Sequence, residues 1–260
     1  METAQFRLHA DIEERHWWFV ARRMIIRDLL AATVPPGDGR LVVDIGCGTG
    51  ANLASLVGDY RCLGADCSPE AIELARQRFP AVEFRVGRAP EVIGDLWSEV
   101  CAVLLMDVLE HVDDDRSMFA SIWRAAPKGC VFLVTVPADP RLWSPHDEAF
   151  GHFRRYTAEQ LIDHWRGRPA ETLLVSHFNA RLLPLIRLAR RMARAKGKAG
   201  GQAGTDFRMP PHWLNILLTR VFYGERRRLL AVLRGRRRRG YRAGASLVAL
   251  LRKSSDSNKD

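Results

Sequence analysis

The chain has 260 residues, 47% hydrophobic and 27% charged, which is enough length and apolar content to bury a core. No apolar run reaches the roughly 20 residues of a membrane-spanning helix, and the N-terminal residues show no secretion signal. The net charge of +10 is unevenly spread, because residues 1–179 hold 19 basic and 26 acidic side chains whereas residues 180–260 hold 21 and 4. The five cysteines form no CxxC pair, and we expect a cytoplasmic protein with reduced thiols.

Apolar runs and helical periodicities alternate along most of the chain. The run at 100–106 is almost wholly apolar, as expected for a strand covered on both faces. Such alternation favours a parallel sheet with helices on both faces. In chain order, we expect a helix at 12–32, a strand at 41–45, a helical stretch to about 57, a strand at 61–65, a helix at 69–79, strands at 82–86 and 100–106, a helix at 115–126, a strand at 130–136, a helix at 158–166, a strand at 172–178, helices at 181–195 and 212–234 joined by the Gly-rich stretch 197–205, and a strand at 245–251.

These elements predict one α/β domain with a Rossmann-like, seven-stranded, mostly parallel sheet. Some 65 residues separate the last two strands, more than an ordinary connection needs, so we expect a helical insertion there. The predicted parts are an N-terminal lid helix (1–35), a cofactor-binding core (36–179), a basic helical insertion (180–243), and a final strand with a disordered tail (244–260).

Residues 42–50 read V-V-D-I-G-C-G-T-G, a strand end followed by alternating glycines. Glycines let the backbone turn sharply and approach a ligand. A dinucleotide fingerprint would read G-x-G-x-x-G, but here the third glycine comes one residue early. The pattern resembles motif I of class I S-adenosylmethionine (SAM) dependent methyltransferases, where the loop cradles the methionine moiety. The resemblance implies that Asp44, Gly46, Cys47 and Gly48 bind the cofactor.

A carboxylate, Asp66, ends the second expected strand some 20 residues after the glycine loop. A carboxylate there can accept both ribose hydroxyls of an adenosine, and its alternative role is a helix N-cap. Relatives often place an acid at the end of the third strand, where this chain has Arg88. We therefore expect adenine recognition to rest on the backbone around Ala89 or on the wall formed by Cys67.

The fourth expected strand runs into L-M-D-V-L-E-H-V at 105–112. This resembles the D-V-L-E-H-V segment of the superfamily that includes quinone-biosynthesis O-methyltransferases and sugar N-methyltransferases, which implies that Met106 and Asp107 line the cofactor cleft. His111 is a candidate general base, with a structural histidine as the alternative. Glu110 and His111 with Asp107 also match a metal site of the quinone enzymes. Because relatives without metal share these letters, we expect no metal, with Mg²⁺ as the alternative.

Residues 142–157 gather aromatic, histidine and arginine side chains after the fifth strand, at the sheet edge where open α/β folds bind ligands. We interpret the segment as a substrate-facing wall that supplies a base and pairs an anionic group. The alternative is that Arg155 and Tyr156 only hold the following helix. The candidates are His146, His152 and Tyr156 for catalysis, and Trp143, Arg154 and Arg155 for substrate binding.

The segment E-E-R-H-W-W-F at 13–19, followed by two arginines, completes the resemblance. It is similar to the opening of a bacterial methyltransferase group that combines E-x-x-H-W-W-F-x-x-R with later S-x-H-D and G-H-x-R-R-Y-T segments, and the likeness covers most of residues 10–180. In such enzymes the leading helix closes over SAM and an arginine pairs the methionine carboxylate, which implies Arg22 or Arg23. Trp17 is a candidate substrate contact, or a core anchor.

Residues 220–242 hold ten arginines against Glu225 alone. Such a segment can lie on an anionic membrane surface, bind nucleic acid, or form a solvated or self-associating face, as in a homodimer. No aromatic-stacking module accompanies the arginines, so we expect no nucleic-acid partner. The predicted location is cytoplasmic, with peripheral attachment at the inner membrane surface as a variant.

Methyl transfer is a displacement at a sulfonium carbon, so the protein must orient a nucleophile and remove a proton. We predict a SAM-dependent methyltransferase of a small molecule, acting at oxygen, in secondary-metabolite, quinone or glycolipid biosynthesis. The alternative is N-methylation of an amine, an amino-sugar or a peptide N-terminus. Outside the class, the alternative is a non-catalytic SAM- or nucleic-acid-binding module.

Overall fold

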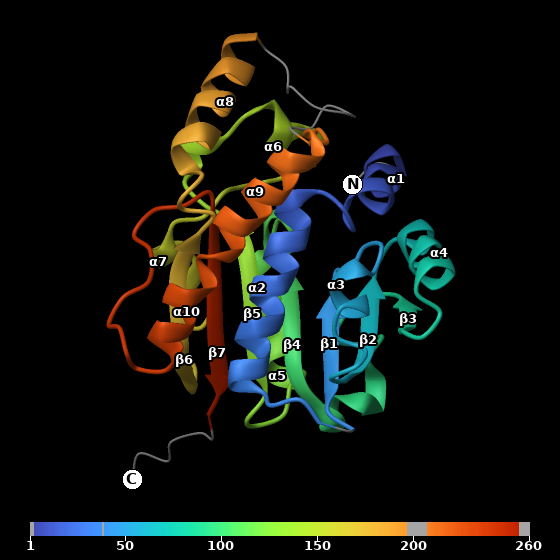
Figure 1. Cartoon of the computed structure of the whole chain (residues 1–260). Coiled ribbons are helices and arrows are strands. Elements are labelled where there is room, and N and C mark those ends of the chain that lie inside the picture. The colour runs from blue at the N-terminus through green and yellow to red at the C-terminus, as the bar shows by residue number, and fades with distance from the viewer. Residues whose placement is uncertain (1–2, 38, 197–206, 255–260) are drawn as a thin grey trace.

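The computed structural model describes residues 3–37, 39–196 and 207–254, and they form a seven-stranded sheet between helices (Figure 1). The strand order is β3-β2-β1-β4-β5-β7-β6, and only β7 runs antiparallel to its neighbours. The predicted Rossmann-like, mostly parallel sheet is confirmed. The strands are β1 (Leu41–Ile45), β2 (Arg61–Asp66), β3 (Glu83–Val86), β4 (Val100–Met106), β5 (Val131–Pro137), β6 (Ala170–Phe178) and β7 (Ser246–Lys253).

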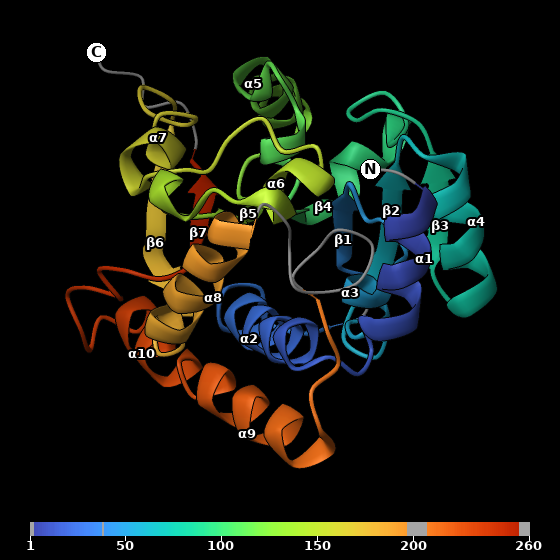
Figure 2. The same cartoon turned by 90° about the horizontal axis from the view of Figure 1, so that it is seen from above.

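Helices cover both faces of the sheet, as Figure 2 shows from above. On one face, α2, α9 and α10 pack on strand residues such as Val42 and Leu104. On the other, α5 and α7 pack on Val43 and Val103, because successive side chains of a strand point to opposite faces. The helices are α1 (Thr3–Ile12), α2 (Trp17–Thr33), α3 (Ala51–Ala54), α4 (Pro69–Arg78), α5 (Asp115–Ala125), α6 (Pro145–Ala149), α7 (Ala158–Ile162), α8 (Leu183–Lys196), α9 (His212–Tyr223) and α10 (Arg226–Leu233), with short 3₁₀ turns at Gly94–Glu99, Leu109–His111 and Pro140–Leu142.

Several expected elements differ from those observed: among them, α3 ends at Ala54 and α7 at Ile162, before the expected ends at about 57 and at 166. The helix expected at 12–32 begins at Trp17, where the side chain of His16 caps α2 by accepting from the Trp18 N–H, and a separate α1 precedes it. The helix expected at 212–234 is broken, because the carboxylate of Glu225 turns inward to accept the N–H groups of Ala180 and Arg181. The 142–157 segment contains the short helix α6. The Gly-rich stretch 197–205 lies outside the described residues.

The carboxyl ends of the parallel strands meet at one edge of the sheet, the upper edge in Figure 1, with α1 and α6 beside it. This edge is where open α/β sheets bind ligands. Among the described helices, none combines the length and apolarity needed to cross a membrane.

Candidate active site

The glycine loop after β1 takes a backbone path that only glycine follows without strain. Gly46 has φ of 73°, and a Cβ there would lie 2.6 Å from a methyl group of Val108. Gly48 has φ of 53°, and its N–H donates to the Asp66 carboxylate at 2.9 Å. The loop therefore presents bare backbone next to the end of β2.

Asp66 is half-buried at the end of β2 and accepts two backbone hydrogen bonds, from Gly48 and, at 2.8 Å, from Ser68. The N-cap of α4 is Ser68, whose hydroxyl accepts from the Ala71 N–H, so the cap role considered for Asp66 belongs to its neighbour. The position of Asp66 beside the glycine loop fits a ribose ligand. Nearby, Cys67 is exposed and Ala89 is half-buried.

Two buried charged groups lie below the loop. Both carboxylate oxygens of Asp44 are buried without a hydrogen-bond partner in the described structure, and burial raises its pKa to about 7. Arg22 is buried, forms an ion pair with Asp107, and stacks over the Trp18 ring at 4.6 Å; burial lowers its pKa to about 10. Asp44 and Arg22 both have buried polar atoms without hydrogen-bond partners in the described structure. The acid suits the ammonium group of a bound amino acid moiety, and the guanidinium suits its carboxylate.

The junction between α1 and α2 reaches over the glycine loop. The Glu13 carboxylate accepts a hydrogen bond from the Thr49 hydroxyl at 2.6 Å and pairs with Arg78. Arg78 also pairs with Glu14 at 2.7 Å and donates to the Thr49 carbonyl at 3.0 Å. Arg23 donates to the Glu13 carbonyl at 2.9 Å, so of the two candidate arginines Arg22 is the one beside Asp107. Sequence reasoning missed Glu13 and Arg78 as a pair, because their 65-residue separation gives no local pattern.

The end of β4 forms the opposite wall. Met106 is buried, and Asp107 adopts φ of 57°, which is uncommon for a residue other than glycine. Its carboxylate accepts a hydrogen bond from the Thr135 hydroxyl at 3.1 Å and pairs with Arg22. Cys47 is buried, and burial raises the pKa of its thiol, so it contributes packing and not a thiolate.

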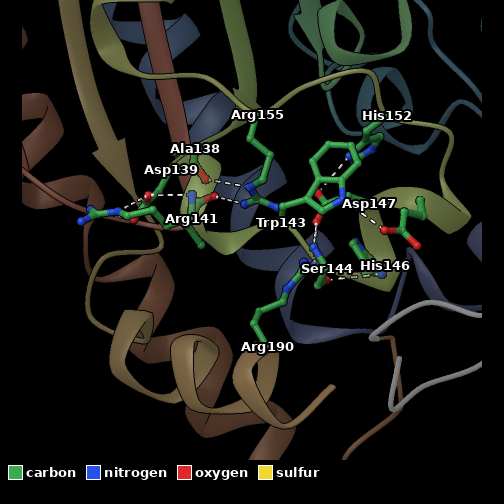
Figure 3. A network of polar contacts seen from close by, with 12 residues as sticks. Ala138, Asp139, Arg141, Trp143, Ser144, His146, Asp147, His152, Arg155 and Arg190 are labelled. Carbon is green, nitrogen blue, oxygen red and sulfur yellow. Dashed lines mark hydrogen bonds and ion pairs between the residues drawn. The ribbon is translucent and has the colours of Figure 1, made fainter. Parts of the chain in front are cut away.

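A histidine pair follows the same edge. His152 contacts the Asp147 carboxylate through Nδ1 at 3.1 Å, and its ring lies edge-on to that of His111, 4.7 Å between centroids. Asp147 is fully buried and binds Arg155 at 2.7 Å and Arg190 at 3.1 Å (Figure 3). Burial alone would raise the pKa of Asp147, but the His152 contact and the two arginines hold it well below its ordinary value.

Other candidates from the 142–157 segment are engaged within the protein. Arg155 is buried and donates to the carbonyls of Ala138 at 2.8 Å and Ala245 at 2.9 Å, which favours the role of holding the segment in place. The Tyr156 hydroxyl donates to Asp115 at 2.6 Å within the core. Arg154 pairs with Asp115 at 2.8 Å.

The aromatic candidates also have structural contacts. The Trp143 indole N–H donates to Glu148 at 3.2 Å. The backbone N–H of Trp17 donates to Asn215, and its ring meets the Phe222 ring edge-on at 6.2 Å, so it joins α2 to α9. Burial lowers the pKa of His146 well below its ordinary value, and its ring lies 4.8 Å from Phe150.

One set of potential metal ligands occurs among the described residues: Glu110, His111 and His152, with ligand atoms within 4.8 Å of one another. Glu110 is fully buried, and its carboxylate oxygens have no hydrogen-bond partner among the described residues. Burial raises the pKa of Glu110 to about 8. Asp107, the third member expected from sequence, pairs with Arg22 instead. Two imidazoles suit a transition metal better than Mg²⁺. The absence of a metal requirement stays a prediction.

Comparison with known proteins adds the family to this geometry. Residues 42–129 match a family described as a methyltransferase domain. This central stretch of the chain is therefore similar to a methyltransferase domain. The chain is 38% identical over 124 residues to a trans-aconitate 2-methyltransferase of Azoarcus sp., covering 45% of this chain and 46% of that protein. It is 34% identical over 112 residues to a ubiquinone biosynthesis O-methyltransferase of Brucella ovis, covering 39% and 43%. The chain thus spans about half the length of the curated relatives it matches.

Solved structures agree on the fold. The methyltransferase described in complex with the Trm112 activator of Haloferax volcanii superposes with a TM-score of 0.57 at 18% identity, covering 98% of this chain and 96% of that chain. The YcgJ protein of Bacillus subtilis superposes with a TM-score of 0.55 at 14% identity, covering 90% and 99%. At such identities the likeness shows the fold of the domain alone.

Proposed function

We propose that this chain transfers a methyl group from SAM to a hydroxyl group of a small molecule. The observation that carries the proposal is the Asp147–His152 pair, whose ring contact with His111 places it beside the end of β4. The relative named as a ubiquinone biosynthesis O-methyltransferase supports oxygen as the acceptor.

The chain offers groups for each part of the cofactor. Asp66 would accept the ribose hydroxyls, Asp44 would bind the methionine ammonium, and Arg22 would bind the methionine carboxylate. When bound, SAM supplies a methyl group already activated by its sulfonium. The tasks left to the protein are orientation of the acceptor and removal of its proton.

His152 is the proposed base. Because Asp147 is held ionised, its carboxylate accepts from Nδ1–H of His152, which leaves Nε2 as the nitrogen that takes a proton. A carboxylate that fixes the tautomer of a base is the arrangement that makes a neutral imidazole effective. His111, edge-on to this ring, would restrict the position of the acceptor.

The proposal is tested by titrating SAM and NAD(H) into the purified protein, followed by a product assay for S-adenosylhomocysteine with panels of phenols, carboxylic acids and amines. We expect SAM binding, no NAD(H) binding, and turnover with an oxygen acceptor. Turnover confined to amines would replace O- with N-methylation. A protein with no affinity for SAM would refute the assignment.

A further inference from the structure

We propose that the outer face of α9 and α10 docks on an anionic lipid surface. In Figure 2 these two helices lie end to end in the outermost layer on their side of the sheet. We call this surface the basic helical face. It is defined by the exposed side chains Trp213, Ile216, Leu217, Arg220, Arg227 and Arg234.

The first half of α9 presents large apolar side chains to solvent. Trp213 is 68% exposed, Leu217 49% and Ile216 37%. Their spacing of three and four residues puts them on one side of the helix, while Phe222, from the same helix, is fully buried against the domain. A clustered Trp, Ile and Leu group without cover marks an interaction surface. Tryptophan in particular suits the boundary between water and lipid.

The arginines of α10 and the turn after it line two adjoining hollows. One, of about 210 Å³, is lined by Arg226, Arg227, Arg234 and Arg236 together with Leu230 and Ala231. The other, of about 360 Å³, is lined by Arg181, Arg227, Arg228, Arg237 and Tyr241. Hollows lined by several guanidinium groups fit phosphate oxygens, which arginine binds in pairs.

These arginines carry little compensating charge. Arg226 pairs with Asp28 at 2.9 Å, but Arg227, Arg234 and Arg236 form no ion pair with any carboxylate in the described ranges. In the second hollow, the Nε of Arg228 is buried and has no hydrogen-bond partner among the described residues. The hollows therefore retain both charge and hydrogen-bonding capacity for an anion.

The arginines together with the exposed apolar side chains favour an anionic bilayer as the binding partner. Counterion release would attract any polyanion to the arginines, but it gives no reason for Trp213, Ile216 and Leu217 to be exposed beside them. An anionic bilayer satisfies both: its headgroup phosphates meet the arginines while the apolar side chains enter the interface. The acidic first 179 residues would also repel a nucleic acid that extended beyond this face.

The test is co-sedimentation of the full chain with vesicles of pure phosphatidylcholine and of phosphatidylcholine mixed with phosphatidylglycerol. We expect binding to the mixed vesicles only. The double variant Arg227→Gln/Arg234→Gln should weaken it by about tenfold or more, since each basic side chain contributes near the surface. Trp213→Ala should weaken it by about fivefold, including at raised salt, where the apolar part of the binding persists.

The control is Arg116→Gln/Arg166→Gln, which removes the same charge from exposed arginines near α5 and α7, on the other side of the sheet. It should bind mixed vesicles like wild type. Equal loss in the control, or an unaffected Trp213→Ala variant, would overturn the proposal in favour of unspecific charge attraction. Tighter binding to a random DNA duplex than to vesicles would replace it with a nucleic-acid surface, and light scattering that shows a dimer broken by Trp213→Ala would replace it with self-association.

Discussion

At the scale of single residues, Asp66 links the two halves of the proposed cofactor pocket. Its carboxylate accepts the Gly48 and Ser68 N–H groups, so it orders the glycine loop and the start of α4. Hydrogen bonds to a charged group contribute about 1.5–3 kcal/mol each. We therefore expect Asp66→Ala to lower SAM affinity at least about tenfold, measured by calorimetry.

Asp66→Asn keeps one acceptor oxygen and serves as the matched control for folding. It should bind SAM with intermediate affinity, and thermal unfolding of both variants should show whether the loop remains ordered. Unchanged SAM affinity in Asp66→Ala would remove this carboxylate from the ribose site.

Asp44 makes the stability of the free protein depend on pH. Burial raises its pKa from 3.8 to about 7, so between these values the folded state holds a proton that the unfolded state has released. The stability from this group is complete below its unfolded pKa and is lost as the pH rises through about 7, at most about 1.4 kcal/mol per pH unit. We expect Asp44→Asn to lose less stability than wild type between about pH 4 and about pH 7 in urea unfolding. Parallel pH profiles would contradict the assignment.

The two histidines of the 142–157 segment have different surroundings, and we expect only one of them to act as the base. His152 has an ionised carboxylate partner, whereas burial lowers the pKa of His146 and surrounds it with aromatic rings. His152→Ala should slow methyl transfer by about 10²- to 10⁴-fold with SAM affinity unchanged, and His146→Ala should slow it far less. Single-turnover assays with the acceptor found in the panel measure both. Full activity of His152→Ala would exclude it as the base.

At the scale of elements, the strands were predictable because their apolar runs are continuous and end at turns. The breaks in helices were not. The separation of α1 from α2 depends on the His16 cap. The break between α9 and α10 depends on the Glu225 carboxylate, which accepts the N–H groups of Ala180 and Arg181, 45 and 44 residues earlier in the chain. Such contacts come from tertiary packing, which a helical periodicity does not contain.

The same division holds for the candidate site. The nearness of Gly48 to Asp66 could be predicted, because the carboxyl ends of neighbouring parallel strands meet at one edge of the sheet, and the Gly48 N–H donates to Asp66 there. Their role in binding the cofactor stays a prediction. Arg155 carries the same sequence signal, yet it donates to backbone carbonyls inside the protein. Only the fold distinguishes a buried guanidinium that holds a segment from one that faces a ligand.

The α1–α2 junction is the element expected to move. Arg78 holds it to the glycine loop by pairing with Glu13 and Glu14. Arg78→Ala should speed hydrogen exchange of the junction and weaken SAM binding several-fold, with little change in melting temperature. The control is Arg27→Ala, which breaks the exposed pair with Asp59 on the other end of α2. Equal exchange rates in the two variants would show that Arg78 does not restrain the junction.

At the scale of the whole molecule, α9 of the basic helical face contacts the α1–α2 junction. Asn215 of α9 accepts the Trp17 N–H at 2.8 Å and donates to the Arg15 carbonyl at 2.8 Å. The helix proposed to dock on lipid thus holds the segment proposed to close over the cofactor. A change in the position of α9 would be transmitted to Glu13 through only a few residues.

This connection predicts coupling between lipid and cofactor. If docking on anionic vesicles favours the closed junction, vesicles should tighten SAM binding, and SAM must tighten vesicle binding by the same factor, because linkage is reciprocal. We expect a factor of about five, at the lower end of measured couplings. Asn215→Ala should abolish the coupling while leaving vesicle binding intact, since Asn215 lies outside the basic helical face. SAM affinity that vesicles leave unchanged, or coupling that persists in Asn215→Ala, would contradict the proposed connection.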